Sequence, residues 1–428
     1  MSNSRYLVLL WLLCLTFRLA GQDTVIIPEH IPPYDSLKLL YPFLDIKENQ
    51  IRGDTASLMP FFRKLGRIEK GSREQAVVVH IGDSHVQPGV FSQPLREWLQ
   101  GAFGNAGRGM MFPYRLAKSN GPAGYITHCD TPWIYCRNAT MKRPLPTGIA
   151  GFSLWSDKPS ASFTVEFTAP LPPCDTARLI IFHANRDSCY AFSVSNELTG
   201  HSYPVADSSS PGQTTLLIGD QPEKIRIRAV PVKQSQKSAT FYGMSLESLK
   251  PGVIVHTIGV NGAMFSSYVE SEHFVEQLAS LHPDLMIFSL GTNEAFGVKG
   301  YSAATLRGSI DSLFRQIRLS GNLAPALLTT PPAIYKATRK KRHTTYKPNP
   351  VAGEVSELLC RYALSHCMTV WDWYTIMGGK ESMAKWKSKH LTDRRYIHFS
   401  GKGYGIQGTL LREAMHGSYD HTLNINHR

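Results

Sequence analysis

The chain has 428 residues, of which 42% are hydrophobic and 18% are charged. This composition is ordinary for a globular protein with a buried core, and it excludes disorder or a coiled coil as the main structure. The length exceeds one average domain and predicts two. The formal net charge of +13 indicates that the surface favours polyanions as partners.

The first 21 residues have the features of a secretory signal. Arg5 precedes an apolar run over residues 7–15, and the small Ala20 and Gly21 stand before Gln22. The run is too short to span a bilayer, so we expect cleavage and export to the periplasm or the extracellular space. A lipoprotein would have a cysteine in place of Gln22, which favours release. No later segment predicts a transmembrane helix.

The densest positive charge lies at residues 339–343. Runs of charge usually stay solvated, and we expect a solvated loop here. Binding to nucleic acid would rest on the net charge alone, whereas an exported protein meets anionic envelope polymers or lipid head groups. We therefore expect no nucleic-acid partner.

Six cysteines follow the predicted signal: Cys129, Cys136, Cys174, Cys189, Cys360 and Cys367. An even number in an exported chain is compatible with up to three disulfides. None of the cysteines has the spacing of a metal site, so we predict no metal.

Five short runs rich in apolar and β-branched residues predict buried parallel strands at 76–81, 253–258, 285–290, 324–330 and 368–373. Helical patterns follow most of them, at 93–99, 268–281, 302–319, 355–365 and 405–415. The clearest begins at Ser302, which can cap the helix. This alternation predicts a doubly wound α/β sheet.

One long segment interrupts the alternation. From residue 114 to about 250 there is no helical pattern, but alternating runs occur at 161–167, 177–183, 190–194, 214–218 and 224–230. They predict an inserted β-sandwich or jelly roll. We therefore expect a signal over 1–21, an N-terminal extension over 22–74, an α/β domain in two parts over 75–113 and 252–428, and the insert over 114–251.

Residues 82–85 (Gly-Asp-Ser-His) follow the first predicted strand. Ser84 therefore lies at the carboxyl edge of the sheet, where open α/β sheets place their sites. A serine hydroxyl needs a base to take its proton and donors for the oxyanion that forms. The neighbouring His85 either contacts a substrate or points into the protein. Alone, such a short motif also fits an ordinary turn.

Three further segments stand at matching places. Residues 259–263 follow the second strand and contain Gly262, which leaves backbone N–H groups open to a ligand. Residues 291–294 follow the third strand and contain Asn293, whose amide can donate to the same oxyanion. His398 comes just before the last helix. Four signals on one sheet are harder to obtain by chance than one.

In this order, Gly-Asp-Ser, a turn glycine, Gly-x-Asn and a late histidine resemble the SGNH (GDSL-like) hydrolases. The resemblance covers about 75–111 and 253–415. It implies a three-layer, flavodoxin-like fold with five parallel strands and no cofactor. It also implies Ser84 as nucleophile and His398 as general base and then acid, with the N–H groups of Ser84 and Gly262 and the side chain of Asn293 forming the oxyanion hole.

One departure concerns the acid. The family places it three residues before the histidine, where this chain has Arg395, while Asp393 lies five before. Either the loop bulges so that Asp393 still reaches the Nδ1–H of His398, or a Ser–His dyad operates with help from a backbone carbonyl.

The position of the insert resembles Gram-negative peptidoglycan O-acetylesterases, which carry a carbohydrate-binding-like domain, and residues 82–85 and 398–404 resemble them too. This implies removal of acetyl groups from muramic acid O6. Aromatic residues of the insert could stack on sugars or form its core: Trp133, Tyr135, Trp155, Tyr190 and Tyr203. An acetyl esterase of another polysaccharide, such as xylan or capsule, and a non-catalytic glycan-binding protein are the alternatives.

Overall fold

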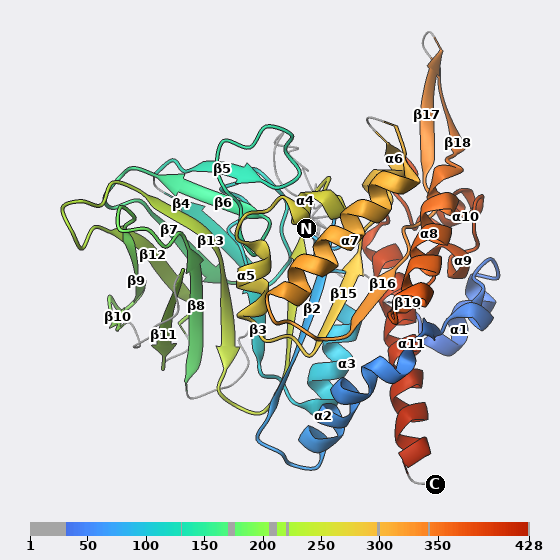
Figure 1. The fold of residues 1–428 in the computed structure, drawn as a ribbon, viewed down its shortest axis with the longest axis horizontal. Helices are drawn as coiled ribbons and strands as arrows, with labels where there is room; N and C mark the ends of the chain where they lie inside the picture. Colours follow the sequence, from blue (N-terminus) through green and yellow to red (C-terminus); the bar gives the residue numbers. More distant parts are fainter. Residues whose placement is uncertain are drawn as a thin grey trace, which may run out of the picture.

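The computed structural model describes residues 31–129, 131–169, 176–204, 212–219, 222–297, 300–340 and 343–426. The predicted signal and Cys174 lie outside these residues. Figure 1 shows a β-rich part on one side, and on the other a sheet covered by helices on both faces.

The central sheet has six strands in the order β1-β19-β16-β15-β2-β14. Its members are β1 (Ile51–Gly53), β2 (Gln75–Gly82), β14 (Gly252–Gly259), β15 (Leu285–Ser289), β16 (Ala326–Thr329) and β19 (Thr369–Trp371). All neighbours are parallel except β1, which pairs antiparallel with β19. The five predicted strands are therefore confirmed, and β1, only three residues long, adds an unpredicted edge strand from the N-terminal extension.

Successive side chains of the sheet enter two different cores. Val78 and Ile287 pack with helices α2, α3 and α11, whereas Val79 and Phe288 pack with α4, α5, α7, α8 and the insert. The helices are α1 (Tyr34–Leu40), α2 (Met59–Glu69), α3 (Gln93–Phe103), α4 (Phe265–Val269), α5 (Phe274–Ala279), α6 (Thr292–Phe296), α7 (Ala303–Leu319), α8 (Val351–Ser365), α9 (Trp373–Ile376), α10 (Ser382–Ser388) and α11 (Gly401–Asn426), with 3₁₀ turns at Ile46–Glu48 and Thr55–Leu58. The predicted layering, helices on both faces of a parallel sheet, is present.

The predicted helix at 268–281 is wrong as a single element, because α4 and α5 are separate. At the break, the N–H of His273 donates to the carbonyl of Thr147 in the insert (3.0 Å), and Glu272 accepts from the N–H of Thr147 (2.9 Å). The insert thus takes the His273 N–H, which a continuous helix would have used. The helix at 302–319 is confirmed, and Ser302 caps it by accepting from the Thr305 N–H.

The insert consists of two antiparallel sheets, in the orders β10-β9-β12-β7-β4 and β11-β8-β13-β6-β5. The ring of Phe241 lies 5.1 Å from Phe163 and 5.9 Å from Phe192 of the other sheet, so the two sheets pack face to face as a sandwich. The strands are β3 (Gly107–Met111), β4 (Tyr125–Cys129), β5 (Ile134–Arg137), β6 (Phe152–Ser156), β7 (Ser162–Phe167), β8 (Ala177–His183), β9 (Ala191–Asn196), β10 (Ser202–Tyr203), β11 (Gln213–Ile218), β12 (Lys224–Val230) and β13 (Ala239–Ser248). β3, from the range predicted for the α/β domain, pairs with β13.

The aromatic residues of the insert serve mainly as core. Trp133, Tyr190 and Tyr203 are buried, while Tyr135 is 37% exposed. Three of the five aromatic side chains considered for sugar stacking are therefore part of the core.

The basic run at 339–343 is solvated as predicted at Arg339 and His343, but its described residues belong to strands and not to a loop. β17 (Tyr335–Lys340) and β18 (His343–Pro348) form an antiparallel hairpin that projects from the α/β part (Figure 1). β-branched Thr338, Thr344 and Thr345 favour strands here. Residues 341 and 342 lie outside the described part of the chain.

Of the up to three disulfides that six cysteines allow, the structure leaves room for at most one. Four of the six cysteines are free thiols: Cys136, Cys189, Cys360 and Cys367. Cys360 and Cys367, seven positions apart, lie in different surroundings. Cys360 is half-buried on α8, where burial raises the pKa of its thiol to about 12, while Cys367 is exposed beyond the end of that helix.

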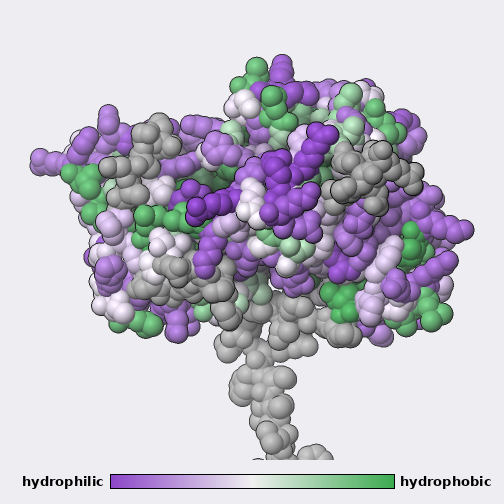
Figure 2. Space-filling view, turned by 90° about the horizontal axis from the view of Figure 1, so that it is seen from below, coloured by the Kyte–Doolittle hydropathy of each residue, from purple (hydrophilic) through white to green (hydrophobic). Residues whose placement is uncertain are grey.

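Across the described residues, the helices are all too short or too polar to cross a membrane. The face drawn in Figure 2 is largely hydrophilic, with its hydrophobic side chains in small separate groups.

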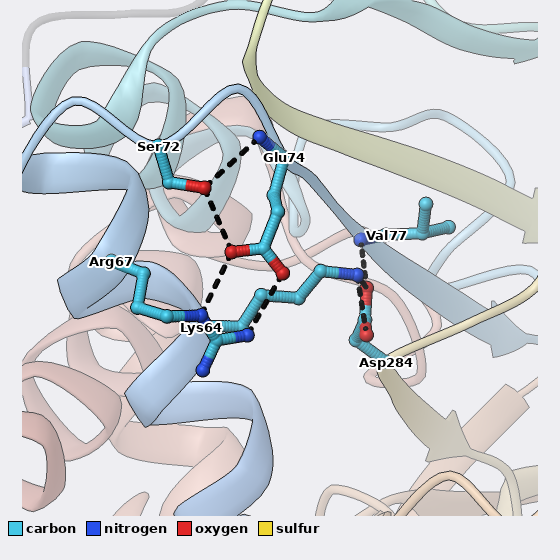
Figure 3. Close-up of polar contacts among 6 residues, drawn as sticks. All are labelled: Lys64, Arg67, Ser72, Glu74, Val77 and Asp284. Carbon is cyan, nitrogen blue, oxygen red and sulfur yellow. Dashed lines mark hydrogen bonds and ion pairs between the residues drawn. The ribbon is translucent and has the colours of Figure 1, made fainter.

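A polar cluster joins α2 to the amino-terminal ends of β2 and β15 (Figure 3). Ser84 follows the other end of β2. Lys64 donates to both carboxylate oxygens of Asp284 (2.9 and 2.8 Å), and Asp284 also accepts from the N–H of Val77 (2.8 Å). Beside it, Arg67 binds Glu74 through two hydrogen bonds of 2.8 Å, which lower the pKa of Glu74 to about 2. These contacts tie α2 to the residues at the start of both strands.

Replacing Asp284 tests this cluster. We expect Asp284→Ala to lower the free energy of unfolding by about 2 kcal/mol, because it leaves the Val77 N–H and the Lys64 ammonium without their acceptor. Asp284→Asn keeps an acceptor and should lose about half as much. Urea unfolding followed by tryptophan fluorescence measures both. Equal stability of the wild type and Asp284→Ala would contradict the role given to the cluster.

Candidate active site

The ends of three neighbouring strands place the predicted site residues. β2 lies between β14 and β15, and Gly82 pairs with Gly259 on one side and Ser289 on the other. A Cβ added to Gly82 would lie 2.3 Å from the Cγ2 of Val86 and 2.8 Å from the carbonyl oxygen of Ser289. Only glycine therefore permits the chain to turn so tightly toward Ser84.

Ser84 and His398 meet although 314 positions separate them. The Oγ of Ser84 lies 2.9 Å from the Nε2 of His398, within hydrogen-bond distance. Both line an open cavity of about 450 Å³, together with Gly262 and Asn293. The structure thus brings the four predicted residues to one cavity. A hydroxyl that is hydrogen-bonded to an imidazole is the arrangement that an activated serine nucleophile requires.

The loop before His398 folds back on itself. Tyr396 has a φ of +60°, in the left-handed region, and the N–H of Asp393 donates to the carbonyl of His398 (2.8 Å). This turn brings Asp393 Oδ2 to 3.6 Å from His398 Nδ1, whereas Arg395 is exposed. The distance allows an ion pair but is too long for a hydrogen bond.

The hairpin holds this loop in place. The N–H of Tyr335, at the base of β17, donates to the carbonyl of Tyr396 (3.1 Å), and the two rings stack at 5.1 Å. Tyr346 of β18 packs on the same ring at 5.2 Å. No sequence motif linked these residues to the site, because their contacts join distant segments.

Asp393 carries its charge in a polar turn. Its Oδ1 accepts from the N–H groups of Arg395 (3.0 Å) and Ile397 (3.2 Å). Partial burial raises the pKa of Asp393, but its contact with His398 and these backbone hydrogen bonds outweigh burial and hold the pKa below its usual value. The carboxylate is therefore ionised near neutral pH and can orient a cationic imidazole.

The backbone N–H groups of Ser84 and Gly262 are the candidate donors to an oxyanion. Gly262 has a φ of +87°, and the Gln87 side chain fixes its turn by accepting from the N–H of Asn261 (2.7 Å). Neither the Ser84 N–H nor the Gly262 N–H donates to any residue that the structure describes. Sequence reasoning missed Gln87, since a glutamine three residues after a serine has no specific signature.

Asn293 is already held by protein acceptors. Its Nδ2 donates to the carbonyl of Ala263 (2.9 Å) and to the Oδ2 of Asp83 (3.3 Å). The longer bond to Asp83 is the weaker, so it is the one to open when the amide turns to a ligand. Asp83 is fully buried, and burial raises its pKa to about 6.

His85, the candidate for substrate contact, lies behind the site. It is 3% exposed, its Nδ1 lies 3.0 Å from the hydroxyl of Tyr404, and its ring centre is 5.2 Å from that of His398. It is not among the residues that line the cavity. His85 therefore packs against the back of His398.

Among the described residues, no three His, Cys, Asp or Glu side chains gather to hold a metal ion.

The buried Asp83 makes stability depend on pH. Its folded-state pKa of about 6 exceeds the ordinary value of 3.8, so the folded protein holds this proton more tightly than the unfolded chain. Its contribution is complete below about pH 4 and is lost as the pH rises through about 6. Between about pH 3 and about pH 7 we expect the wild type to lose about 3 kcal/mol of unfolding free energy that Asp83→Asn does not lose, as measured by urea unfolding at several pH values. Parallel pH profiles would contradict the burial of an ionisable Asp83.

A solved structure with a similar fold matches most of this chain. No family model and no curated protein sequence matches the chain. A solved structure described as a peptidoglycan O-acetylesterase in action matches 87% of this chain and 99% of its own, with 22% identity and a TM-score of 0.71. Two other solved structures match only in part. A lipase/acylhydrolase from Enterococcus faecalis has 21% identity over 39% of this chain and 77% of its own, with a TM-score of 0.29. An acetyl xylan esterase has 14% identity over 38% of this chain and 81% of its own, with a TM-score of 0.30. Because the uncovered part of this chain is much shorter than the insert, the first match extends into the insert, and the chain has the overall fold of that peptidoglycan O-acetylesterase.

Proposed function

We propose that the protein is an exported serine esterase that removes O-acetyl groups from a glycan of the cell envelope, with O6 of muramic acid in peptidoglycan as the favoured position. The observation that carries the proposal is the 2.9 Å contact between Ser84 Oγ and His398 Nε2, in one cavity with the unused N–H groups of Ser84 and Gly262.

In the first half-reaction, Ser84 Oγ attacks the acetyl carbonyl carbon while His398 takes the hydroxyl proton. The carbonyl electrons move to the oxygen, which the N–H groups of Ser84 and Gly262 and the Asn293 amide stabilise. When this intermediate collapses, the bond to the sugar oxygen breaks. That oxygen leaves with the proton from His398, and the acetyl group stays on Ser84.

In the second half-reaction, His398 takes a proton from water as the water oxygen attacks the acetyl carbon. Collapse of the second intermediate breaks the bond to Ser84 Oγ, which regains its proton from His398. Acetate leaves. The nucleophile, the base and the oxyanion donors of both half-reactions are residues of this chain, and water is the second nucleophile.

Asp393 orients His398 in this proposal. At 3.6 Å it favours the imidazolium that forms in both half-reactions, without the short hydrogen bond of a tight triad. The proposed site is therefore intermediate between a triad and a dyad: Ser84 and His398 form a hydrogen-bonded pair, and Asp393 is in electrostatic contact with His398.

Three features support a glycan as the acyl donor. The solved structure that matches over 87% of the chain is described as acting on peptidoglycan. The sequence predicts export, and the net charge of +13 suits a polyanionic wall polymer. The cavity opens to solvent and is lined by several neutral polar side chains, including Asn120, Asn261 and Thr292.

Acetate release tests the proposal. O-acetylated peptidoglycan, acetylated xylan and 4-nitrophenyl acetate are compared for the wild type and Ser84→Ala. We expect preferential release from peptidoglycan, reduced at least 10³-fold in Ser84→Ala. Release from xylan or the small ester alone would keep the esterase and change its substrate. Absence of Ser84-dependent release from all three would overturn the proposal in favour of a glycan-binding protein.

The same assay measures the contribution of the acid. We expect Asp393→Ala to lower kcat about 10- to 10³-fold, because the histidine loses its charge partner but keeps its contact with Ser84. Arg395→Ala, which replaces an exposed residue of the same loop, is the control and should stay within about twofold of the wild type. Equal rates for Asp393→Ala and the control would leave a dyad.

A further inference from the structure

The oxyanion turn, residues 260–263, is a β-turn whose central peptide bond can face either of two ways. The N–H of Ala263 donates to the carbonyl of Val260 (2.9 Å), so Asn261 and Gly262 are its central residues. The φ of +87° at Gly262 belongs to the type II form. In a type I turn this peptide bond is flipped, and the Gly262 N–H points the opposite way. An oxyanion hole that uses this N–H therefore needs contacts that hold the peptide in one orientation.

Gln87 holds this turn from the side of the nucleophile. It lies three residues after Ser84, it is 1% exposed, and it is not among the residues that line the Ser84 cavity. Its Oε1 accepts from the N–H of Asn261 (2.7 Å). Because a backbone N–H can only donate, the oxygen of the Gln87 amide must face Asn261 and its nitrogen must face elsewhere. Gln87 thus acts on the turn without lining the cavity.

The nitrogen of the Gln87 amide is held by the segment that leads into the insert. It donates to the Oγ of Ser119 (2.8 Å) and to the carbonyl of Asn120 (2.5 Å). The side-chain oxygen of Asn120 also accepts from the side-chain amide of Asn261 (2.8 Å). Asn261 is therefore held twice, at its backbone by Gln87 and at its side chain by Asn120. Both contacts oppose rotation of the peptide bond that follows it.

The segment that contains Ser119 lies between β3 and β4 and is anchored in the core of the sandwich. The N–H of Ser119 donates to the carbonyl of Tyr114 (2.9 Å). The buried ring of Tyr114 packs edge-on against Phe152 of β6, with 5.4 Å between the ring centres. Contacts between neighbouring residues therefore run from the sandwich core, through Ser119 and Gln87, to the oxyanion turn.

We propose that Gln87 is a positioning residue of the oxyanion hole, and that the insert contributes to the rate of the reaction through it. Ser119 and Asn120 orient the Gln87 amide, which holds the backbone of Asn261. The peptide bond after Asn261 then keeps the Gly262 N–H available to the oxyanion. Donors that are already oriented lower the barrier, because they need not reorganise when the charge develops. This inference rests on the proposed esterase function and gives the insert a role that requires no glycan binding.

The test compares Gln87→Met with a matched control in the full-length protein, with 4-nitrophenyl acetate as the substrate. We expect Gln87→Met to lower kcat about tenfold or more and to change KM less than about threefold, because the lost orientation matters mainly in the transition state. The control is Gln277→Met. Gln277 is also buried and accepts from a backbone N–H of the insert, that of Ile149 (2.8 Å), but it does not line the Ser84 cavity. Its kcat should stay within about twofold of the wild type. Equal kcat values for the two variants would contradict the inference.

A double-mutant cycle tests whether the insert acts through Gln87. We expect Asn120→Ala alone to lower kcat about three- to tenfold, and the double variant with Gln87→Met to lie within about twofold of Gln87→Met, because both substitutions release the same peptide bond. Effects that multiply in the double variant would contradict a shared route.

Inhibition by phenylboronic acid distinguishes a misplaced oxyanion donor from a general structural defect, because this compound forms a tetrahedral adduct with an active-site serine. We expect its Ki to rise in Gln87→Met by about the factor by which kcat/KM falls, and to stay unchanged in Gln277→Met. An unchanged Ki in Gln87→Met would contradict the positioning role. Absence of Ser84-dependent hydrolysis in the wild type would instead contradict the proposed function. Thermal unfolding checks that each variant is folded, and Asn120→Ala takes the place of Gln87→Met if that variant does not fold.

Discussion

The position of β2 between two parallel neighbours is the constraint on which the site depends. Parallel strands end at the same edge of a sheet, so the segments after β2, β14 and β15 emerge side by side. The close fit of Gly82 against Val86 and Ser289 leaves no room for a side chain and aims the chain at the position of Ser84. Substituting Gly82 would therefore disturb all three strand ends.

His398 is positioned at this edge by a loop and not by the end of a strand. It lies on a loop before α11, and its position depends on the left-handed Tyr396 and on the stacking of that ring against Tyr335 and Tyr346. The hairpin at β17 and β18 therefore has a structural role next to the site as well as an exposed basic surface. The same turn explains how an acid five residues before His398 comes within 3.6 Å of it.

Sequence patterns predicted the parts of the fold that local chemistry determines. The five parallel strands are short apolar runs, and each lies within two or three residues of its predicted bounds. β13 was missed because all ten of its residues are buried and it shows no alternation. β1 has only three residues and gains its pairing from β19. Both are set by tertiary contacts that no local window contains.

The same limit applies to the site. Ser84, Gly262, Asn293 and His398 follow recognisable motifs, and the structure gathers them at one cavity. Gln87 has no motif, because its position matters only once its side chain lies next to the N–H of Asn261 in the oxyanion turn. His85 illustrates the reverse case, since a residue adjacent to the serine in sequence is buried behind the histidine.

The central claim is that His398 activates Ser84 as a nucleophile, and covalent labelling tests it most directly. The protein is treated with a serine-reactive fluorophosphonate, and the modified residue is identified by peptide mass mapping. The account predicts one adduct on Ser84 and labelling at least 10²-fold slower in His398→Ala. Labelling of His398→Ala at the wild-type rate, or no adduct on Ser84, would contradict it.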